Sequence, residues 1–248
     1  MEVSKKIDFI KDWILNYVNS MPTKAESLVI GISGGIDSSV SSTLSAMTGL
    51  KTIVISMPIK QKTTQHDLSL KHQDWLKKNF KNVSGFTIEL DNLFSTFEKT
   101  LSNFNNEHGM ANSRARLRMS TLYQVAAANK GIVVGTGNKV EDFGVGFYTK
   151  YGDGGVDISP IADLLKTEVY ILAKYLKIIK SIQKADPTDG LWPDSRTDEE
   201  QIGVTYEELE WAMKIYEKRN DINTFSERQK LVLKTYEEFN KKNHHKMI

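Results

Sequence analysis

The chain has 248 residues, 33 of them basic and 31 acidic, and it contains no cysteine. This charge balance argues against a large nucleic-acid-binding surface, and the lack of cysteine excludes disulfides, catalytic thiolates and cysteine-ligated metal centres. No apolar run approaches the ~20 residues that cross a bilayer, and charged residues interrupt the segment where a signal peptide would lie. We expect a soluble cytoplasmic protein that binds neither nucleic acid nor membrane.

The first half of the chain alternates helical and strand patterns. Ile7, Ile10 and Ile14 recur at helical spacing in the opening segment, which Pro22 ends. Short apolar runs rich in β-branched residues predict strands at 27–32, 51–57, 83–90 and 131–135. Amphipathic segments predict helices at 38–47, 64–80, 91–104 and 114–129. Strands that alternate with helices and are apolar throughout indicate an α/β fold, with helices on both faces of a parallel sheet.

The second half has a different texture. Five glycines fall between Gly144 and Gly155, which is typical of a functional loop. Helices are expected again at 165–177, 205–218 and 226–241, and the Pro- and Asp-containing segment 186–200 is expected to be a loop or lid. We find no internal repeat and no low-complexity linker, so we expect residues 1–248 to form a single domain.

The first loop, Gly31-Ile-Ser-Gly-Gly-Ile-Asp-Ser38, joins a predicted buried strand to a helix. Backbone N–H groups and the positive end of a helix converge at such a place, which favours an anion. Glycines allow close approach of a phosphate, serine hydroxyls can donate to it, and Asp37 can hold a hard cation between phosphates. The loop lacks the Gly-Lys-Ser/Thr ending of a Walker A motif.

A second interpretation of the loop is a serine hydrolase elbow, because Gly31 to Gly35 also fits Gly-x-Ser-x-Gly. His244 or His245 would then be the late histidine of the triad. The oxyanion hole of such enzymes uses a strand-to-helix loop upstream of the elbow, and here the elbow follows the first predicted strand. A third interpretation is a tight turn without a ligand.

The loop resembles the Ser-Gly-Gly-x-Asp-Ser signature of the PP-loop ATP pyrophosphatases, at Ser33 to Ser38. Three later segments look like consecutive blocks of the ammonia-dependent NAD synthetases in that group: Asn112 to Met119, Gly135 to Glu141 and Phe147 to Asp157. The segment Ile202-Gly-Val-Thr-Tyr206 matches that family as well. The resemblance implies a Rossmann-like fold of the adenine nucleotide alpha hydrolase type, a homodimer, and a chain without a glutaminase domain.

The resemblance also implies the residues that bind each substrate. Those that contact ATP would be Gly31, Ile32, Ser33, Gly34, Gly35, Ile36, Asp37, Ser38, Thr136, Lys166 and Thr188. Mg²⁺ would be bound by Asp37 and Glu141. Those that contact deamido-NAD would be Arg116, Lys150, Asp157, His245 and Lys246. Asp153 would be catalytic, by positioning or deprotonating the incoming ammonia.

Several of these positions have simpler interpretations. Lys166 could be a solvated lysine, Asp153 a turn former before glycine, and the terminal His245-Lys246 pair a fraying tail. Arg114 and Arg118 share a helix face that Arg116 does not, and are expected at a solvated helix start.

Two departures from the family stand out. The chain ends at Ile248, before the longer tail of many relatives. After Pro58 it lacks their acidic ATP loop, and Gln61, Lys62 and Gln65 are weak candidates for contacts with the nucleotide there.

The implied reaction is amidation of deamido-NAD by ammonia, with ATP cleaved to AMP and diphosphate through an adenylated intermediate, the final step of NAD biosynthesis. ATP is then a co-substrate and Mg²⁺ the metal. Two alternatives stay open at this stage: another amide-forming or thiolating PP-loop enzyme, and a non-catalytic nucleotide sensor.

Overall fold

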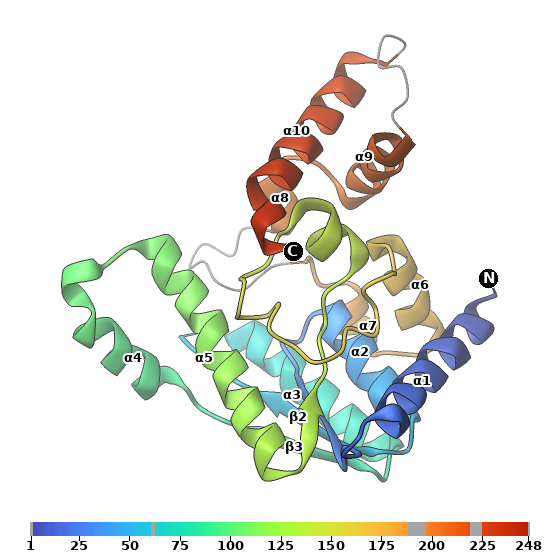
Figure 1. Ribbon diagram of the computed structural model, residues 1–248, viewed down its shortest axis with the longest axis vertical. Helices are drawn as coiled ribbons and strands as arrows, with labels where there is room; N and C mark the ends of the chain where they lie inside the picture. The colour runs from blue at the N-terminus through green and yellow to red at the C-terminus, as the bar shows by residue number, and fades with distance from the viewer. Residues whose placement is uncertain (1, 61–62, 188–196, 219–224, 248) are drawn as a thin grey trace.

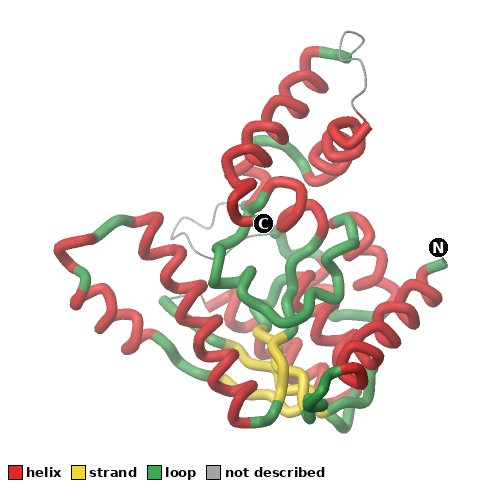
Figure 2. The backbone as a smooth tube through the Cα atoms, in the orientation of Figure 1, coloured by secondary structure: helices red, strands yellow, loops and turns green. Residues whose placement is uncertain are grey.

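The core of the protein is a four-stranded parallel sheet with the order β3-β2-β1-β4. The computed structural model describes residues 2–60, 63–187, 197–218 and 225–247 (Figure 1). The strands are β1 (Ser27–Gly31), β2 (Lys51–Ser56), β3 (Val83–Thr87) and β4 (Gly131–Val133). Figure 2 shows the sheet at one end of the molecule, with helices around it. The predicted α/β fold is therefore confirmed.

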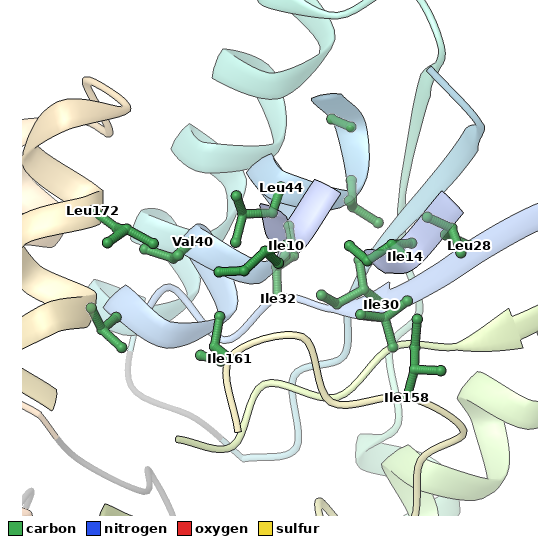
Figure 3. Packing of buried hydrophobic residues seen from close by; sticks show 14 of the residues in the cluster. Ile10, Ile14, Leu28, Ile30, Ile32, Val40, Leu44, Ile158, Ile161 and Leu172 are labelled. Atoms are coloured by element: carbon green, nitrogen blue, oxygen red, sulfur yellow. The ribbon is translucent and has the colours of Figure 1, made fainter. Parts of the chain in front are cut away.

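One face of the sheet is covered by helices from the first and the second half of the chain. Leu28 and Ile30 of β1 point into this layer, where they pack with Ile10, Ile14, Val40 and Leu172 (Figure 3). The alternation of side chains along a strand sends Val29 to the other face. The helices on the first face are α1 (Val3–Ser20), α2 (Ile36–Met47), α3 (Thr63–Asn79) and α6 (Lys166–Tyr175), followed by the short α7 (Lys180–Gln183).

The opposite face packs against α4 (Asp91–Thr100) and α5 (Glu107–Ala128), and the 3₁₀ turn η1 (Ser102–Phe104) lies between these two helices in the chain. α5 begins seven residues before the predicted start at 114. The segment that the prediction missed contains Gly109, Asn112 and Ser113, which have low helix propensity. Asn106 starts the helix, because its side chain accepts a hydrogen bond from the N–H of Gly109 at 2.8 Å.

A further group of helices, separate from those on the two faces of the sheet, lies beyond the carboxyl ends of the strands. It consists of the π-helix η2 (Lys139–Val145), α8 (Asp198–Ile202), α9 (Tyr206–Lys218), α10 (Glu227–Asn243) and the turn η4 (His244–Lys246). α9 and α10 form a hairpin that projects away from the sheet (Figure 1). Val140 and Val145 of η2 are fully buried in the apolar cluster of this hairpin. None of the helices described is both long and apolar enough to span a membrane.

Between α2 and α3 the core contains a polar seam. His72 of α3 is fully buried, its Nε2 lies 3.0 Å from the Ser42 hydroxyl, and its ring stacks on Trp75 with 5.6 Å between centroids. Desolvation by burial lowers the pKa of His72 to about 4, which a backbone contact with Ser39 only partly offsets.

We predict that the free energy of unfolding falls as the pH is lowered from about 6.5 to about 4. Between the unfolded pKa of 6.5 and the folded pKa of about 4, only the unfolded chain binds a proton at His72. The loss approaches about 3 kcal/mol, from roughly 1.4 kcal/mol per pKa unit. Urea unfolding of wild type and His72→Gln at pH 7, 6, 5 and 4 measures it. The variant should show a flatter pH dependence, and equal slopes would contradict the prediction.

Candidate active site

The carboxyl ends of β1, β2 and β4 open into one cavity of about 870 Å³. The chain adds β2 and β3 on one side of β1 and then β4 on the other side, so the strand order reverses at β1. Open α/β sheets bind ligands at such a switch point. All eight residues from Gly31 to Ser38 line this cavity, and Thr136, Glu141, Asp153 and Lys166 line it too. The sheet therefore brings together most of the predicted ATP site.

The loop after β1 is held by its own serines. The Ser33 N–H donates to the Ser38 hydroxyl at 3.2 Å, and the Gly35 N–H donates to the Ser33 hydroxyl at 3.1 Å. Gly34 has a φ of +89°, a conformation that favours glycine. Among the described residues, no histidine is hydrogen-bonded to Ser33, so the arrangement gives no support to the hydrolase interpretation. α2 starts at Ile36 and presents its N-terminal end to the cavity.

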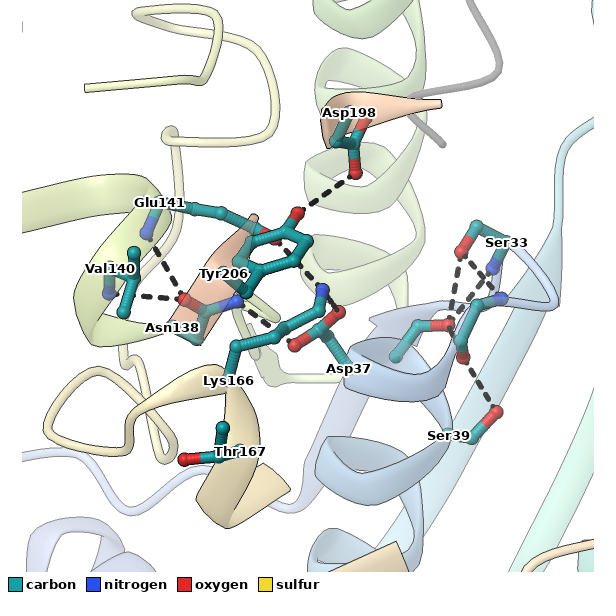
Figure 4. A network of polar contacts seen from close by, with 12 residues as sticks. Ser33, Asp37, Ser39, Asn138, Val140, Glu141, Lys166, Thr167, Asp198 and Tyr206 are labelled. Atoms are coloured by element: carbon teal, nitrogen blue, oxygen red, sulfur yellow. Dashed lines mark hydrogen bonds and ion pairs between the residues drawn. The ribbon is translucent and has the colours of Figure 1, made fainter. Parts of the chain in front are cut away.

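Lys166, at the start of α6, joins the two predicted metal ligands. Its Nζ donates to Asp37 Oδ2 at 2.6 Å and to Glu141 Oε1 at 2.8 Å (Figure 4). The lysine is only 2% exposed, so it is not the solvated side chain of the simpler interpretation. The three charges form one buried network built from three distant parts of the chain.

The network shifts the ionisation of each member. Burial alone would lower the pKa of Lys166, but the two carboxylates raise it above the usual lysine value. Burial also disfavours the charge on Glu141, yet attraction to Lys166 holds its pKa below the usual value. For Asp37 burial dominates and raises the pKa, although Lys166 offsets part of the effect. We infer one ammonium balanced by carboxylates in a desolvated site.

Asn138 connects the two carboxylates and was not singled out from the sequence. Its Nδ2 donates to Asp37 Oδ1 at 3.1 Å, and its Oδ1 accepts the N–H groups of Val140 and Glu141, each at 3.1 Å. The residue is fully buried and caps η2. The signal that could have found it is an asparagine a few residues after a strand, in a position typical of a helix N-cap.

The donor set fits a magnesium ion bound together with a nucleotide. No group of three or more potential metal-ligating side chains occurs within the described ranges, so a cage made by the protein alone is not formed there. Mg²⁺ typically takes one or two carboxylates and completes its coordination with water and substrate phosphates. Asp37 and Glu141, which line the same cavity as the predicted ATP loop, match this pattern.

Asp153 lines the same cavity as the loop of residues 31–38. Its Oδ1 accepts the Thr149 N–H at 3.0 Å, which fixes the carboxylate within the glycine-rich segment. Desolvation raises its pKa, and the negative charge of Glu141 adds to the effect. It is therefore both a turn residue and a carboxylate with a perturbed pKa that faces a cavity.

The predicted deamido-NAD residues divide into two groups. His245 and Lys246 line the cavity, whereas Arg116, Lys150 and Asp157 are not in its lining. The Arg116 Nε donates to the Lys150 carbonyl at 3.3 Å, and the Lys150 Nζ to the His245 carbonyl at 2.6 Å. Asp157 is bound to the Val133 N–H at 2.7 Å. Thr188, Gln61, Lys62 and the side chain of Gln65 lie outside the described residues.

The end of the chain is bound to the backbone of the glycine-rich segment. Asn240 donates to the Gly144 carbonyl at 2.7 Å and Asn243 to the Val145 carbonyl at 2.8 Å. Lys246 donates to the carbonyls of Gly146 and Tyr148, each at 2.9 Å. Side chains spaced three apart thus bind three successive carbonyls, so the His-Lys pair is a docked element rather than a fraying tail.

Arg118 corrects the expectation of a solvated helix start. Its Nε donates to the Met57 carbonyl at 2.9 Å, and the side chain lines the cavity. Desolvation by burial, with repulsion from Arg114, lowers its pKa to about 10. Spacing on a helix identified which face it shares with Arg114, but could not show that this face covers the end of β2.

Comparison with known proteins identifies the family. The profile of the family described as NAD synthase matches residues 6–248. The chain belongs to this family. The NH(3)-dependent NAD(+) synthetase of Mesoplasma florum is 36% identical over 85% of this chain and 84% of its own.

Solved structures of similar proteins agree with the fold. The NMN synthetase of Francisella tularensis superimposes with a TM-score of 0.87 at 31% identity, over 100% of this chain and 97% of that one. The NH3-dependent NAD synthetase of Campylobacter jejuni gives 0.79 at 26% identity, over 99% and 96%. The architecture of the NAD synthase family therefore extends over this whole chain.

We predict that Lys166→Met lowers stability by about 3–5 kcal/mol in chelator, because it leaves two buried carboxylates without their cation. Millimolar Mg²⁺ should restore more stability to this variant than to wild type. Urea unfolding with EDTA or Mg²⁺ measures both effects. Lys130→Met, which breaks an exposed pair with Glu26, is the matched control and should change stability by about 1 kcal/mol or less. A Lys166 variant as stable as the control would contradict the prediction.

Proposed function

We propose that this chain is an ammonia-dependent NAD synthetase: it converts the nicotinate carboxyl of deamido-NAD to an amide, with ATP cleaved to AMP and diphosphate. The observation that carries the proposal is the shared cavity, which is lined both by the proposed phosphate-binding loop of residues 31–38 and by Asp153 of the glycine-rich segment. Membership of the NAD synthase family supports the same conclusion. The protein is then a C–N ligase with ATP as co-substrate.

The carboxylate must first be activated, because direct attack by ammonia would have to expel a carboxylate oxygen, which is a poor leaving group at neutral pH. A carboxylate oxygen attacks the α-phosphorus of ATP, a new O–P bond forms, and the bond to the β-phosphate oxygen breaks. The departing diphosphate gathers charge beside the N-terminal end of α2 and the loop from Ser33 to Ser38. The Lys166 ammonium adds positive charge on the same side.

Ammonia then attacks the acyl carbon of the adenylate, and AMP leaves with the bonding electrons of the C–O bond. The attacking nitrogen must lose a proton, and Asp153 is the proposed group that positions or deprotonates it. Its raised pKa makes it a better base than an ordinary aspartate. The glycine-rich segment, bound along its backbone by α10 and η4, would help to exclude water from the adenylate.

Asp37 and Glu141 are the proposed ligands of Mg²⁺, which when bound would neutralise charge on the triphosphate. The remaining assignments extend the family resemblance. Thr136 would contact ATP at the end of β4, and His245 and Lys246 the deamido-NAD within the cavity. Arg116, Lys150 and Asp157 would contact the more distant part of the dinucleotide, since they lie outside the cavity lining. Thr188 keeps its predicted ATP contact as a proposal. The single domain and the homodimer also remain predictions.

The direct test is formation of NAD and AMP by the purified chain. We expect product only when deamido-NAD, ATP, Mg²⁺ and an ammonium salt are all present. Asp37→Asn should lower the rate at least about 100-fold, because it removes several kcal/mol of charge stabilisation at the phosphates. Nucleotide binding without turnover would instead favour the sensor. Esterase activity abolished by Ser33→Ala would favour the hydrolase, and turnover only with another acyl substrate a different PP-loop enzyme.

A second candidate substrate is nicotinate mononucleotide, favoured by the likeness to the Francisella tularensis NMN synthetase over the full length of this chain. Both acids present the same carboxyl to ATP, so the chemistry described above is unchanged. Comparison of kcat/KM for the two acids, at fixed ATP, Mg²⁺ and ammonium, decides between them. We expect deamido-NAD to be preferred; a higher kcat/KM for the mononucleotide would reassign the chain as an NMN synthetase.

A further inference from the structure

Tyr206 lies where the hairpin of α9 and α10 meets the charged network. Its hydroxyl is 2.5 Å from Glu141 Oε1 and 3.1 Å from Asp198 Oδ2, and its ring lies 4.8 Å from the Lys166 Nζ (Figure 4). The side chain is only 4% exposed. A tyrosine hydroxyl carries its proton at neutral pH, so it can donate to both carboxylates.

Glu141 receives two hydrogen bonds on the same oxygen. Both the Lys166 Nζ and the Tyr206 hydroxyl donate to Oε1. A carboxylate bound by two donors at one oxygen has a fixed plane, and its other oxygen is the one that can ligate a cation. A phenylalanine ring at position 206 would fill the same space but would release one of the two constraints.

The surrounding packing gives this contact its geometry. Val140 and Val145, which flank Glu141 in η2, are buried in the same cluster as Tyr206, so the hairpin holds the segment by apolar and polar contacts together. Gly203, with a φ of +86°, turns the chain between α8 and α9, and the Tyr206 N–H donates to Glu199 at 2.9 Å. The segment Ile202-Gly-Val-Thr-Tyr206 thus delivers one hydroxyl to one carboxylate.

We propose that Tyr206 is a positioning residue that orients the Glu141 carboxylate for the metal ion of the nucleotide. This rests on the proposed function in one respect, that Glu141 is a metal ligand. Groups that hold a ligating side chain in place typically contribute about 10–100-fold to metal affinity. The hairpin is therefore part of the metal site, although it supplies none of the proposed ligands.

The test compares Tyr206→Phe with Tyr216→Phe, a control with the same atomic change on the same helix. Tyr216 is 37% exposed, and its ring packs on Tyr236 with 5.5 Å between centroids. Mn²⁺ serves as the probe, with a non-hydrolysable ATP analogue that has methylene between the α- and β-phosphates. Electron paramagnetic resonance measures the free Mn²⁺, and circular dichroism checks that each variant is folded.

We expect the Kd for Mn²⁺ to rise about 10–100-fold in Tyr206→Phe and to stay unchanged in Tyr216→Phe. In turnover assays the Mg²⁺ concentration for half-maximal rate should rise by the same factor, whereas the KM for deamido-NAD should not change. Addition of Tyr206→Phe to Glu141→Gln should weaken Mn²⁺ binding by much less than it does in wild type, because both changes remove one interaction.

Three outcomes would overturn the proposal: wild-type Mn²⁺ affinity in folded Tyr206→Phe, loss of kcat that saturating Mg²⁺ does not restore, or unfolding of that variant, which would show a purely structural role. The proposed function fails separately. If no amide forms, the Mn²⁺ comparison can still succeed. If wild type binds no Mn²⁺ with the nucleotide analogue, the metal role of Glu141 and the positioning role of Tyr206 are both wrong.

Discussion

The buried ammonium of Lys166 is the interaction on which the site depends. It lies between Asp37, which follows the central strand β1, and Glu141, which follows the neighbouring edge strand β4, and so joins the two strands beyond their ends. Two desolvated carboxylates would repel each other without a cation between them. The cation also ties α6 to both segments, so the helix layer and the sheet are held together by charge as well as by apolar contact.

This arrangement follows from parallel topology. Parallel strands place all their carboxyl ends at one edge, so residues about a hundred positions apart in sequence become neighbours. Asn138 has two roles, because its side-chain nitrogen donates to Asp37 and its side-chain oxygen caps the start of η2. The hairpin then closes over η2 through Val140, Val145 and Tyr206. Glu141 of η2 is therefore the residue at which α6 and the hairpin meet, through Lys166 and Tyr206.

The sequence predicted the sheet, its helices on both faces and the loop from Gly31 to Ser38 that lines the cavity, because strand patterns and this loop are local signals. It did not predict η2, since a π-helix of seven residues is too short to show a hydrophobic period. It also treated Arg118 as solvated and left Tyr206 and Asn138 without a role. Each of these depends on which segments pack across the site, and helical spacing alone carries no information about packing partners.

The contacts between α10 with η4 and the glycine-rich segment have an evolutionary consequence. Asn240, Asn243 and Lys246 bind carbonyl oxygens of residues 144, 145 and 146, and every amino acid has such an oxygen. No substitution at those three positions can delete the acceptor, although a side chain at Gly146 would collide with Asn243 and displace it. A lost asparagine therefore cannot be rescued by a matching replacement opposite it, and covariation between the two segments should be weak even though they are in direct contact.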